Sequence, residues 1–259
     1  MNETEKFANE VEENIKSLSD DKFLKSLSYM WLRDVAPHKY SYNFRWLGRP
    51  AIMLPTDGWA IQELIWKIKP DLIIEAGIAH GGSLIYYASI LAMLDLSDAI
   101  QNQIKLDPKA SKRKVLGIDV EIREHNRASI EAHPMFNWIE MIEGSSISKG
   151  VIDKVQQTAS KSAKTMVILD SNHTQDHVLA ELEAYAPMVS VGSYCVVYDT
   201  IVEDMPANQQ PNRPWGPGNN PKTAVWEFLK NNKQFQIDNK ITNKLQITVG
   251  PDGYLKRIL

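Results

Sequence analysis

The spacing of hydrophobic positions divides this 259-residue chain into a helical start and a long alternating core. From about Glu3 to Arg33, apolar residues recur every three or four positions, with an interruption near residues 19–21. This pattern predicts two amphipathic helices. An aromatic, proline-bearing segment from Tyr40 to Pro50 follows without a clear period, and it either covers a pocket or connects elements. The next helix is expected over Asp57–Lys69.

After residue 70, short apolar runs alternate with helical patterns, which is typical of a parallel sheet with helices on both faces. The predicted strands are Asp71–Ala76, Lys114–Val120, Ile139–Glu143, Thr165–Asp170 and Ser193–Asp199. The predicted helices are Ser83–Leu94, Arg123–Ala132, Ile147–Ser160, Gln175–Tyr185 and Lys222–Asn231. Residues 94–112 read as a polar insertion. Two final alternating runs, Phe235–Asn239 and Leu245–Val249, predict a hairpin at the sheet edge.

These elements predict an α/β fold with a doubly wound, mostly parallel, seven-stranded Rossmann-like sheet and an N-terminal helical extension. Residues 1–56 are expected to form that helical and aromatic extension, packed on a core domain of residues 57–259. The length suits one domain with additions.

A glycine-rich turn joins the first core strand to a long apolar helix, in the stretch from Ile73 to Ser83. Its glycines allow positive φ and close approach of a ligand, and the helix start offers free N–H groups. A phosphate loop would need a lysine after the glycines, and a dinucleotide loop spaces its glycines differently. Glu75 at the strand end instead suits a ligand with a cationic amino group, such as S-adenosylmethionine. The alternative is a tight structural turn.

The amino-acid composition limits the kinds of molecule that the protein is expected to bind. The formal net charge of −3, with acidic and basic residues interspersed, disfavours nucleic acid. The single Cys195 excludes a disulfide framework and a thiolate metal cluster and suits a reducing compartment. The first residues are polar, and no apolar run is read as long enough to cross a bilayer. We expect a cytoplasmic protein with a small-molecule substrate and no membrane partner.

Acids at strand ends are candidate ligands, because ligands gather at the carboxyl ends of parallel strands. Asp119 ends the second core strand, where it can accept both hydroxyls of a ribose. Its alternative is an N-cap of the next helix. Ser145 and Ser146 follow the third strand and are candidates for contacting an adenine, although capping of the next helix explains them equally well.

Asp170 and Asp199 end two strands that are expected to be neighbours. Adjacent strands lie about 4.8 Å apart, so one hard cation such as Mg²⁺ can join both carboxylates and orient a substrate hydroxyl. The alternative is two separately capped loop acids. His173, three residues after Asp170, is a candidate general base for a hydroxyl proton, or it orders the loop.

Two motifs resemble the cephalosporin hydroxylase family of class I S-adenosylmethionine-dependent methyltransferases. An Ile-Glu-x-Gly-x-x-x-Gly-Gly-Ser turn is matched at Ile74 to Ser83, and an Asp-Ser-x-His-Thr segment at Asp170 to Thr174. Further agreement lies in residues 186–194 and 214–225. The resemblance implies the class I methyltransferase fold and relatives that include sugar and natural-product O-methyltransferases with a Mg²⁺ site.

The resemblance also implies a metal held by an Asp after the fourth strand and a Glu-Asp pair after the fifth. Asp170 and Asp199 match this pattern, but Tyr198 stands at the Glu position. A phenol is a poor substitute for a carboxylate at a Mg²⁺ site. Glu203, Asp204 or water molecules are the candidates to compensate for it.

The leading hypothesis is an S-adenosylmethionine-dependent, Mg²⁺-assisted O-methyltransferase acting on a hydroxyl of a sugar or other polar metabolite, in natural-product or polysaccharide biosynthesis. Asp170 and His173 would be catalytic, Asp170 and Asp199 would bind the metal, and the loop Ile201–Pro221 with Trp215 would shape the acceptor site. The expected cofactor-binding residues are Glu75, Gly77, Ala79, Gly81, Ser83, Asp119, Ser145 and Asp170.

Two alternatives stay open. Tyr198 motivates a non-catalytic protein that keeps the cofactor pocket as a binding module. An oxygenase function follows from the family name, but no His-x-Asp triad for non-haem iron is apparent at the strand ends. The N-terminal helices are also expected to pack either on their own domain or on another subunit of a homo-oligomer.

Overall fold

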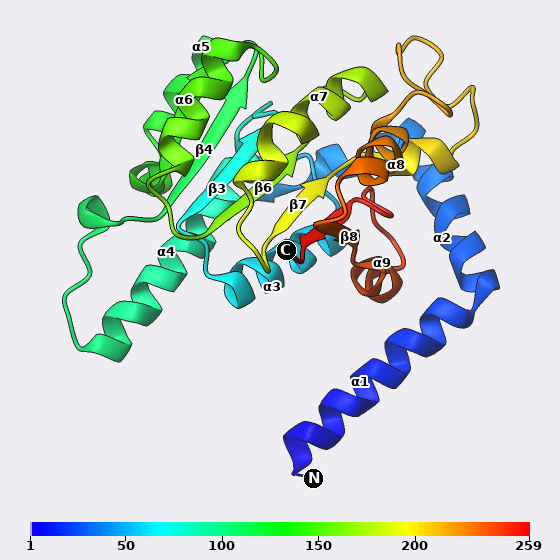
Figure 1. Cartoon of the computed structure of the whole chain (residues 1–259), viewed down its shortest axis with the longest axis horizontal. Helices are drawn as coiled ribbons and strands as arrows, with labels where there is room; N and C mark the ends of the chain where they lie inside the picture. The colour runs from blue at the N-terminus through cyan, green and yellow to red at the C-terminus, as the bar shows by residue number, and fades with distance from the viewer. Residues whose placement is uncertain (1) are drawn as a thin grey trace.

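The computed structural model describes residues 2–259 and contains a seven-stranded sheet with helices on both faces (Figure 1). The sheet order is β5-β4-β3-β6-β7-β9-β8, and β9 is the one strand that runs opposite to the other six. The strands are β3 (Leu72–Ala76), β4 (Lys114–Asp119), β5 (Ile139–Glu143), β6 (Thr165–Leu169), β7 (Tyr194–Val197), β8 (Phe235–Ile237) and β9 (Tyr254–Arg257). The predicted fold class is confirmed.

The order in which strands are added to the sheet reverses at β3. This strand pairs with β4 on one side and with β6 on the other. In register, Ala76 lies opposite Ile118 and Leu169. The residues that follow these three strands therefore reach the same edge of the sheet. In a doubly wound sheet this reversal opens a crevice at the carboxyl ends of the strands.

Alternate strand residues face two helical layers. Ile73, Met166 and Val196 pack with the helices that precede and follow β3, whereas Ile74, Val167 and their neighbours pack with the later helices. The first layer contains α3 (Pro55–Ile68) and α4 (Gly82–Asn102), and the second contains α6 (Lys149–Ala159), α7 (Gln175–Tyr185) and α8 (Pro221–Asn231). The short helix α5 (Glu124–Glu131) follows β4.

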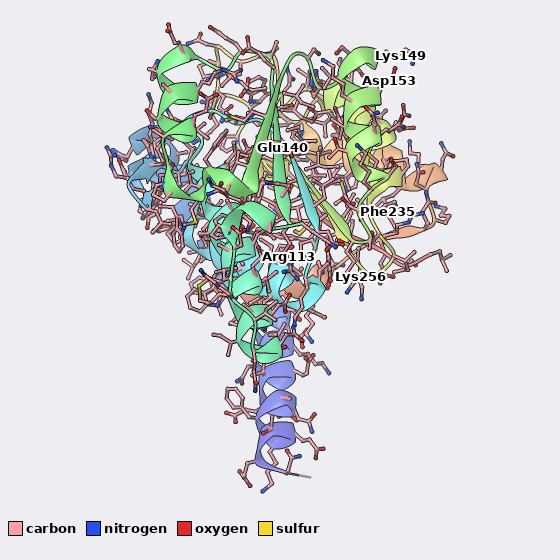
Figure 2. All side chains as sticks on the ribbon, turned by 90° about the vertical axis from the view of Figure 1, so that its left-hand side faces the viewer. Arg113, Glu140, Lys149, Asp153, Phe235 and Lys256 are labelled. Atoms are coloured by element: carbon pink, nitrogen blue, oxygen red, sulfur yellow. The ribbon has the colours of Figure 1, made fainter. Side chains whose placement is uncertain are left out.

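Helix α4 is longer than the sequence pattern predicts, and the polar insertion begins later. The Arg113 guanidinium, labelled in Figure 2, pairs with Asp95 and Asp98 of α4, and Trp138 donates to Asp95 at 2.7 Å. These contacts stabilise the polar part of α4, so the helix continues to Asn102. By length and composition α4 is the one described helix that could cross a membrane, and half of its apolar window is buried. The expectation that no such run exists is therefore wrong, although half-burial suits a core helix.

The predicted terminal hairpin is correct in one strand and wrong in the other. Phe235–Ile237 forms β8, but its partner is Tyr254–Arg257 rather than Leu245–Val249. Residues 239–245 form helix α9 (Asn239–Leu245), and Leu245 and Val249 pack against the core. The buried Asp57 carboxylate of α3 accepts from the Val249 N–H at 3.0 Å and from the Thr248 hydroxyl. These bonds hold residues 248 and 249 on α3, away from the sheet.

The N-terminal helices are α1 (Glu3–Asp20) and α2 (Lys22–Val35), as the sequence predicts. Helix α1 extends away from the body and has contacts with α9 (Figures 1 and 2). The segment after α2 forms a short turn at Tyr40–Asn43 and a small hairpin of β1 (Arg45–Trp46) and β2 (Arg49–Pro50). This segment lies over the carboxyl ends of the strands, where it forms one wall of a cavity.

Candidate functional site

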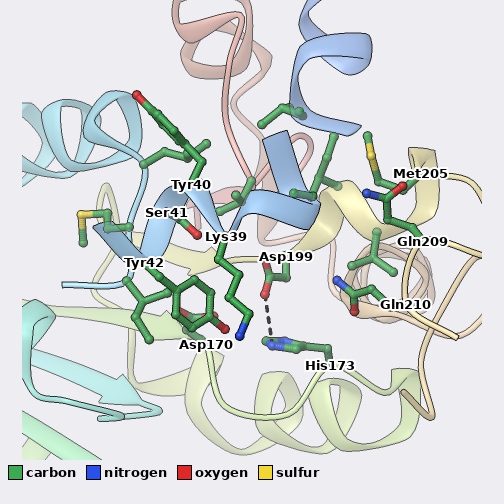
Figure 3. Close-up of a pocket in the computed structure, with 18 of the residues that line it drawn as sticks. Lys39, Tyr40, Ser41, Tyr42, Asp170, His173, Asp199, Met205, Gln209 and Gln210 are labelled. Atoms are coloured by element: carbon green, nitrogen blue, oxygen red, sulfur yellow. Dashed lines mark ion pairs between the residues drawn. The ribbon is translucent and has the colours of Figure 1, made fainter. Parts of the chain in front are cut away.

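A cavity of about 400 Å³ lies between the N-terminal segment and the carboxyl ends of β3, β6 and β7 (Figure 3). Its size falls in the range of small-molecule sites. Four groups of residues line most of it: the N-terminal segment, the glycine turn, the strand-end residues Asp170, His173 and Asp199, and the loop that contains Trp215. Among the predicted cofactor residues, Gly77, Ala79, Ser83 and Asp170 line this cavity.

The glycine turn adopts the backbone conformations that its sequence predicts. Gly77 has φ +101° and Gly81 has φ +79°, and Gly81 is the N-cap of α4. A Cβ on Gly77 would lie 2.1 Å from the Asp170 carbonyl oxygen, so glycine is required for the approach of β6. Ala79 also has a positive φ of 47°, which is uncommon for a residue with a side chain. The turn is a strained backbone segment that opens onto the cavity.

The Asp119 carboxylate holds the glycine turn. Its Oδ2 accepts from the Ile78 N–H at 2.9 Å and from the Ala79 N–H at 3.2 Å, and its Oδ1 accepts from the Glu121 N–H at 3.2 Å. These bonds rule out the simple N-cap alternative, because Arg123 is the N-cap of α5 and makes no side-chain cap bond. Oδ2 therefore uses both of its lone pairs, whereas Oδ1 keeps one, so contact with a ribose stays a prediction for Asp119.

Two residues that sequence reasoning did not select brace the same turn. The Arg49 guanidinium of β2 donates to the His80 carbonyl oxygen and, at 3.1 Å, to the Asn126 side-chain oxygen. The Asn126 amide in turn donates to the Ala79 carbonyl at 3.0 Å. The aromatic segment of residues 40–50 was the only sequence signal that this region covers a pocket.

Glu75 lies beneath the turn and is 2% exposed. Its Oε2 has no hydrogen-bond partner among residues 2–259. Burial raises the pKa of Glu75 to about 8; the Ser83 hydroxyl opposes this rise, and the charge of Asp119 adds to it. An unpartnered buried oxygen next to a ligand turn fits a cationic group of a bound cofactor.

The capping alternative for Ser145 and Ser146 is wrong. Neither side chain caps α6, whose N-cap is Ser148. The Ser145 carbonyl accepts from the Ser148 N–H at 3.0 Å, and the buried Ser146 hydroxyl donates to the Glu181 carboxylate at 2.5 Å. Contact of Ser145 with an adenine stays a prediction.

Asp170, His173 and Asp199 converge at the floor of the cavity. One ligand atom from each of the three half-buried residues lies within 4.8 Å of the others, and His173 Nε2 lies 3.1 Å from Asp199 Oδ2. Figure 3 marks this His173–Asp199 pair with a dashed line. Burial, followed by the charge of Asp199, raises the pKa of the Asp170 carboxyl well above its usual value. Two carboxylates and an imidazole are a donor set that fits a divalent cation.

The loop that bears His173 is held on both sides. The Asn172 side-chain oxygen accepts from the Thr174 N–H at 2.9 Å and from its hydroxyl at 2.8 Å. The Trp215 ring meets the His173 ring edge-on, with centroids 4.8 Å apart. The imidazole orientation is therefore set by the loop Ile201–Pro221, which the sequence assigns to the acceptor site.

The acids expected to compensate for Tyr198 are engaged elsewhere. The Glu203 carboxylate accepts from the Gly218 N–H at 2.7 Å and from the Asn220 amide at 2.5 Å, and Asp204 pairs with Lys222 at 2.5 Å. Tyr198 is 4% exposed and packs in the core that contains Tyr87 and Tyr254. The expected compensation by Glu203 or Asp204 is wrong, because both acids stabilise the loop before α8. His173 lies beside Asp170 and Asp199 in their place.

The chain matches a known protein family over most of its length. Residues 38–258 match the family model described as rhamnosyl O-methyltransferase/CmcI. The chain belongs to this family. The resemblance found in the glycine turn and in residues 170–174 is thereby confirmed. The matched region begins after α2 and includes the glycine turn, both metal-candidate aspartates and the loop with Trp215.

Proteins of similar sequence align with most of the chain. A rhamnosyl O-methyltransferase of Mycobacterium bovis (strain BCG / Pasteur 1173P2) is 30% identical over 229 residues, which cover 85% of this chain and 83% of the relative. One from Mycobacterium leprae (strain TN) is 26% identical over 176 residues, 65% of this chain and 68% of the relative.

Solved structures of CmcI share the fold. The apo structure has a TM-score of 0.58 at 17% identity and covers 84% of this chain and 77% of that one. The S-adenosylhomocysteine-bound structure has a TM-score of 0.54 at 18% identity and covers 85% of each chain. These similarities support the class I methyltransferase architecture of the core.

Proposed function

We propose that this protein is an S-adenosylmethionine-dependent O-methyltransferase that acts on a sugar hydroxyl. The single observation that carries the proposal is one cavity in which the glycine turn faces Asp170, His173 and Asp199. The family supports the reaction, because its curated members include rhamnosyl O-methyltransferases. A rhamnosyl group is therefore the first acceptor to test.

The cofactor would lie along the glycine turn. Gly77, Ala79 and Ser83 line the cavity, Glu75 lies beneath it with an unpartnered oxygen, and Asp119 holds the turn from the adjacent strand. A cationic amino group near Glu75 would favour the ionised carboxylate. Gly81 and Ser145 complete the proposed contacts. Each of these residue roles is a proposal that binding measurements on variants test.

Asp170 and Asp199 would hold a divalent cation, with Mg²⁺ as the expected ion. When bound, such an ion lowers the pKa of a substrate hydroxyl and orients it. His173 lies beside these carboxylates, and Trp215 fixes its ring. The net reaction joins the acceptor oxygen to the methyl carbon, leaves the carbon–sulfur bonding pair on sulfur, and releases the hydroxyl proton.

The outer part of the cavity suits a polar, ring-shaped acceptor. Tyr40, Tyr42 and Trp215 supply aromatic faces, and Gln209 and Gln210 supply amide groups. Lys39 points into the cavity from the N-terminal segment (Figure 3). Aromatic faces and amide hydrogen bonds together match the apolar faces and hydroxyls of a sugar.

The test is formation of S-adenosylhomocysteine and a methylated glycoside from S-adenosylmethionine and a rhamnosyl glycoside, with a divalent cation present. We expect turnover by the natural sequence, and a loss of at least about a hundredfold in Asp170→Asn, because the reaction depends on this charge. The His125→Ala variant is a matched control, since His125 is exposed and outside the cavity. No methyl transfer together with no calorimetric binding of S-adenosylmethionine would contradict the proposal.

A non-catalytic binding module is the second candidate, and Tyr198 is its motivation. Against it, Asp170, His173 and Asp199 converge without any contribution from Tyr198. Cofactor binding without turnover on any rhamnosyl glycoside would favour it. We also propose that the protein works in the cytoplasm on a small molecule, without a nucleic-acid or membrane partner.

A further inference from the structure

We propose that His173 is a metal ligand, which together with Asp170 and Asp199 forms a two-carboxylate, one-imidazole site for a divalent transition-metal cation such as Mn²⁺. This inference rests on the proposed function, because it concerns the same cavity. It changes the role of His173 from general base to ligand and alters the class of cation that the site prefers.

The spacing of the donor atoms carries the inference. Ligand atoms that lie about 2.1 Å from a cation and at right angles are about 3.0 Å apart, and opposite ligands are about 4.2 Å apart. His173 Nε2 and Asp199 Oδ2 are separated by 3.1 Å, and all three donors lie within 4.8 Å of one another. Small side-chain movements bring such a trio around one ion.

The neighbouring acidic residues are not free to act as the third metal ligand. Glu203 accepts two hydrogen bonds from residues 218 and 220, and Asp204 forms an ion pair with the nearly buried Lys222. Glu75 and Asp57 are buried beneath the cavity rather than lining it. Among residues 2–259, the Asp170, His173 and Asp199 group is the one that brings three donors together in this cavity.

Contacts with neighbouring residues also hold the His173 imidazole in one orientation. The Trp215 ring packs edge-on against it, and the Trp215 indole N–H donates to the Gln210 side-chain oxygen at 2.7 Å. The Arg213 guanidinium lies over this indole, 5.0 Å from its centroid. A ligand held by surrounding contacts is typical of metal sites.

Ligand chemistry then predicts the preferred cation. Mg²⁺ favours oxygen ligands, whereas imidazole suits first-row transition metals, and affinity for a given site rises from Mn²⁺ towards Co²⁺ and Cu²⁺. A site with one nitrogen donor should therefore bind Mn²⁺ more tightly than Mg²⁺. Mg²⁺ can still occupy the two carboxylates, so this preference is compatible with Mg²⁺-supported turnover.

The test is pulsed electron paramagnetic resonance of the full-length protein loaded with Mn²⁺, which detects the nitrogen of a coordinated imidazole. We expect ¹⁴N coupling in the natural sequence and in the exposed control His125→Ala, and its loss in His173→Ala. Calorimetric titration of His173→Ala should show Mn²⁺ affinity reduced by about tenfold or more, with a smaller change for Mg²⁺.

Three results would overturn the assignment: Mn²⁺ bound without nitrogen coupling, no Mn²⁺ binding, or a His173→Ala variant that keeps its Mn²⁺ affinity while losing methyl transfer. The last result would make His173 a proton-transfer residue. Titration with S-adenosylmethionine on the same samples verifies that His173→Ala is folded. Failure of the natural sequence to bind S-adenosylmethionine would contradict the proposed function instead, whatever the metal spectrum.

Discussion

The glycine turn and the buried Glu75 concentrate the unusual chemistry of this chain in a few residues. Gly77 has a positive φ and no room for a Cβ, and Glu75 is a carboxyl group removed from water with one oxygen unpartnered among residues 2–259. Both features cost folding free energy and lie at the proposed cofactor site. Such local costs are common where a site must be preorganised.

Replacement of Gly77 tests the turn. Gly77→Ala should lower the free energy of unfolding by more than about 2 kcal/mol, because the Cβ meets the Asp170 carbonyl and the backbone is left-handed. Gly150→Ala is the control: a Cβ on Gly150, in α6, has no atom within 4 Å and should raise stability by up to about 1 kcal/mol. Urea denaturation measures both, and equal effects would contradict the account.

Glu75 predicts a dependence of stability on pH. The folded protein holds a proton on Glu75 up to about pH 8, whereas an unfolded chain loses it near 4.5. The free energy of unfolding should therefore fall as pH rises through this window. Asp57, whose pKa burial raises to about 6, adds to the lower part of the decline.

The variant that isolates this effect is Glu75→Gln, which keeps the shape of the neutral side chain. We expect its stability to fall less than that of the natural sequence between about pH 6 and pH 8 in urea titrations. Parallel curves for the two proteins would show that Glu75 does not hold the proton.

The small hairpin of β1 and β2 connects the N-terminal segment to the cofactor turn. Arg49 in β2 bonds the His80 carbonyl and Asn126, and Asn126 bonds the Ala79 carbonyl. Sequence periodicity could not reveal this element, because each of its strands has only two residues. The residues that Arg49 contacts, His80 and Asn126, also lie far along the chain. The link is visible only once the sheet has brought residues 45–50 above the turn.

Loss of this link should weaken cofactor binding. Arg49→Ala is expected to reduce the affinity for S-adenosylmethionine by about fivefold or more, since charge-assisted bonds to the turn are removed. Arg45→Ala on the same hairpin should leave the affinity unchanged, because the Arg45 guanidinium bonds the Gly48 carbonyl within its own turn. Isothermal titration calorimetry compares the two variants, and an unchanged affinity in Arg49→Ala would disprove the bracing role.

Regular elements of the core follow from the sequence, and the exceptions have tertiary causes. Strand β5 and helix α7 match their predicted bounds, because hydrophobic period and burial agree there. The extension of α4 depends on Arg113, and the displacement of residues 245–249 depends on the buried Asp57. Both partners are remote in sequence, so periodicity cannot reveal them.

Sequence motifs locate the site, but they do not show which of its side chains contact one another. Strand order brings Asp170 and Asp199 together as predicted, whereas the assignment of His173 to their cluster and the engagement of Glu203 needed coordinates. Loop conformation decides these points, and it depends on contacts such as that between Trp215 and His173.

The whole molecule combines a sheet that presents strand-end acids with an N-terminal segment that covers them. We propose that residues 1–56 form an extension packed on the core domain of residues 57–259, because residues 32–42 line the cavity opposite the strand ends. Helix α1 extends beyond this body, and Phe7 and Phe23 are largely exposed. Association into a homo-oligomer stays a prediction that analytical ultracentrifugation tests.

The central claim is that one cavity holds S-adenosylmethionine beside the cluster of Asp170, His173 and Asp199. The most direct measurement is a crystal structure of the protein with S-adenosylhomocysteine and Mn²⁺. The account predicts the ribose at Asp119, the amino group near Glu75, and the sulfur facing a cation held by Asp170 and Asp199. A nucleoside bound elsewhere, or a cation outside this cluster, would contradict it.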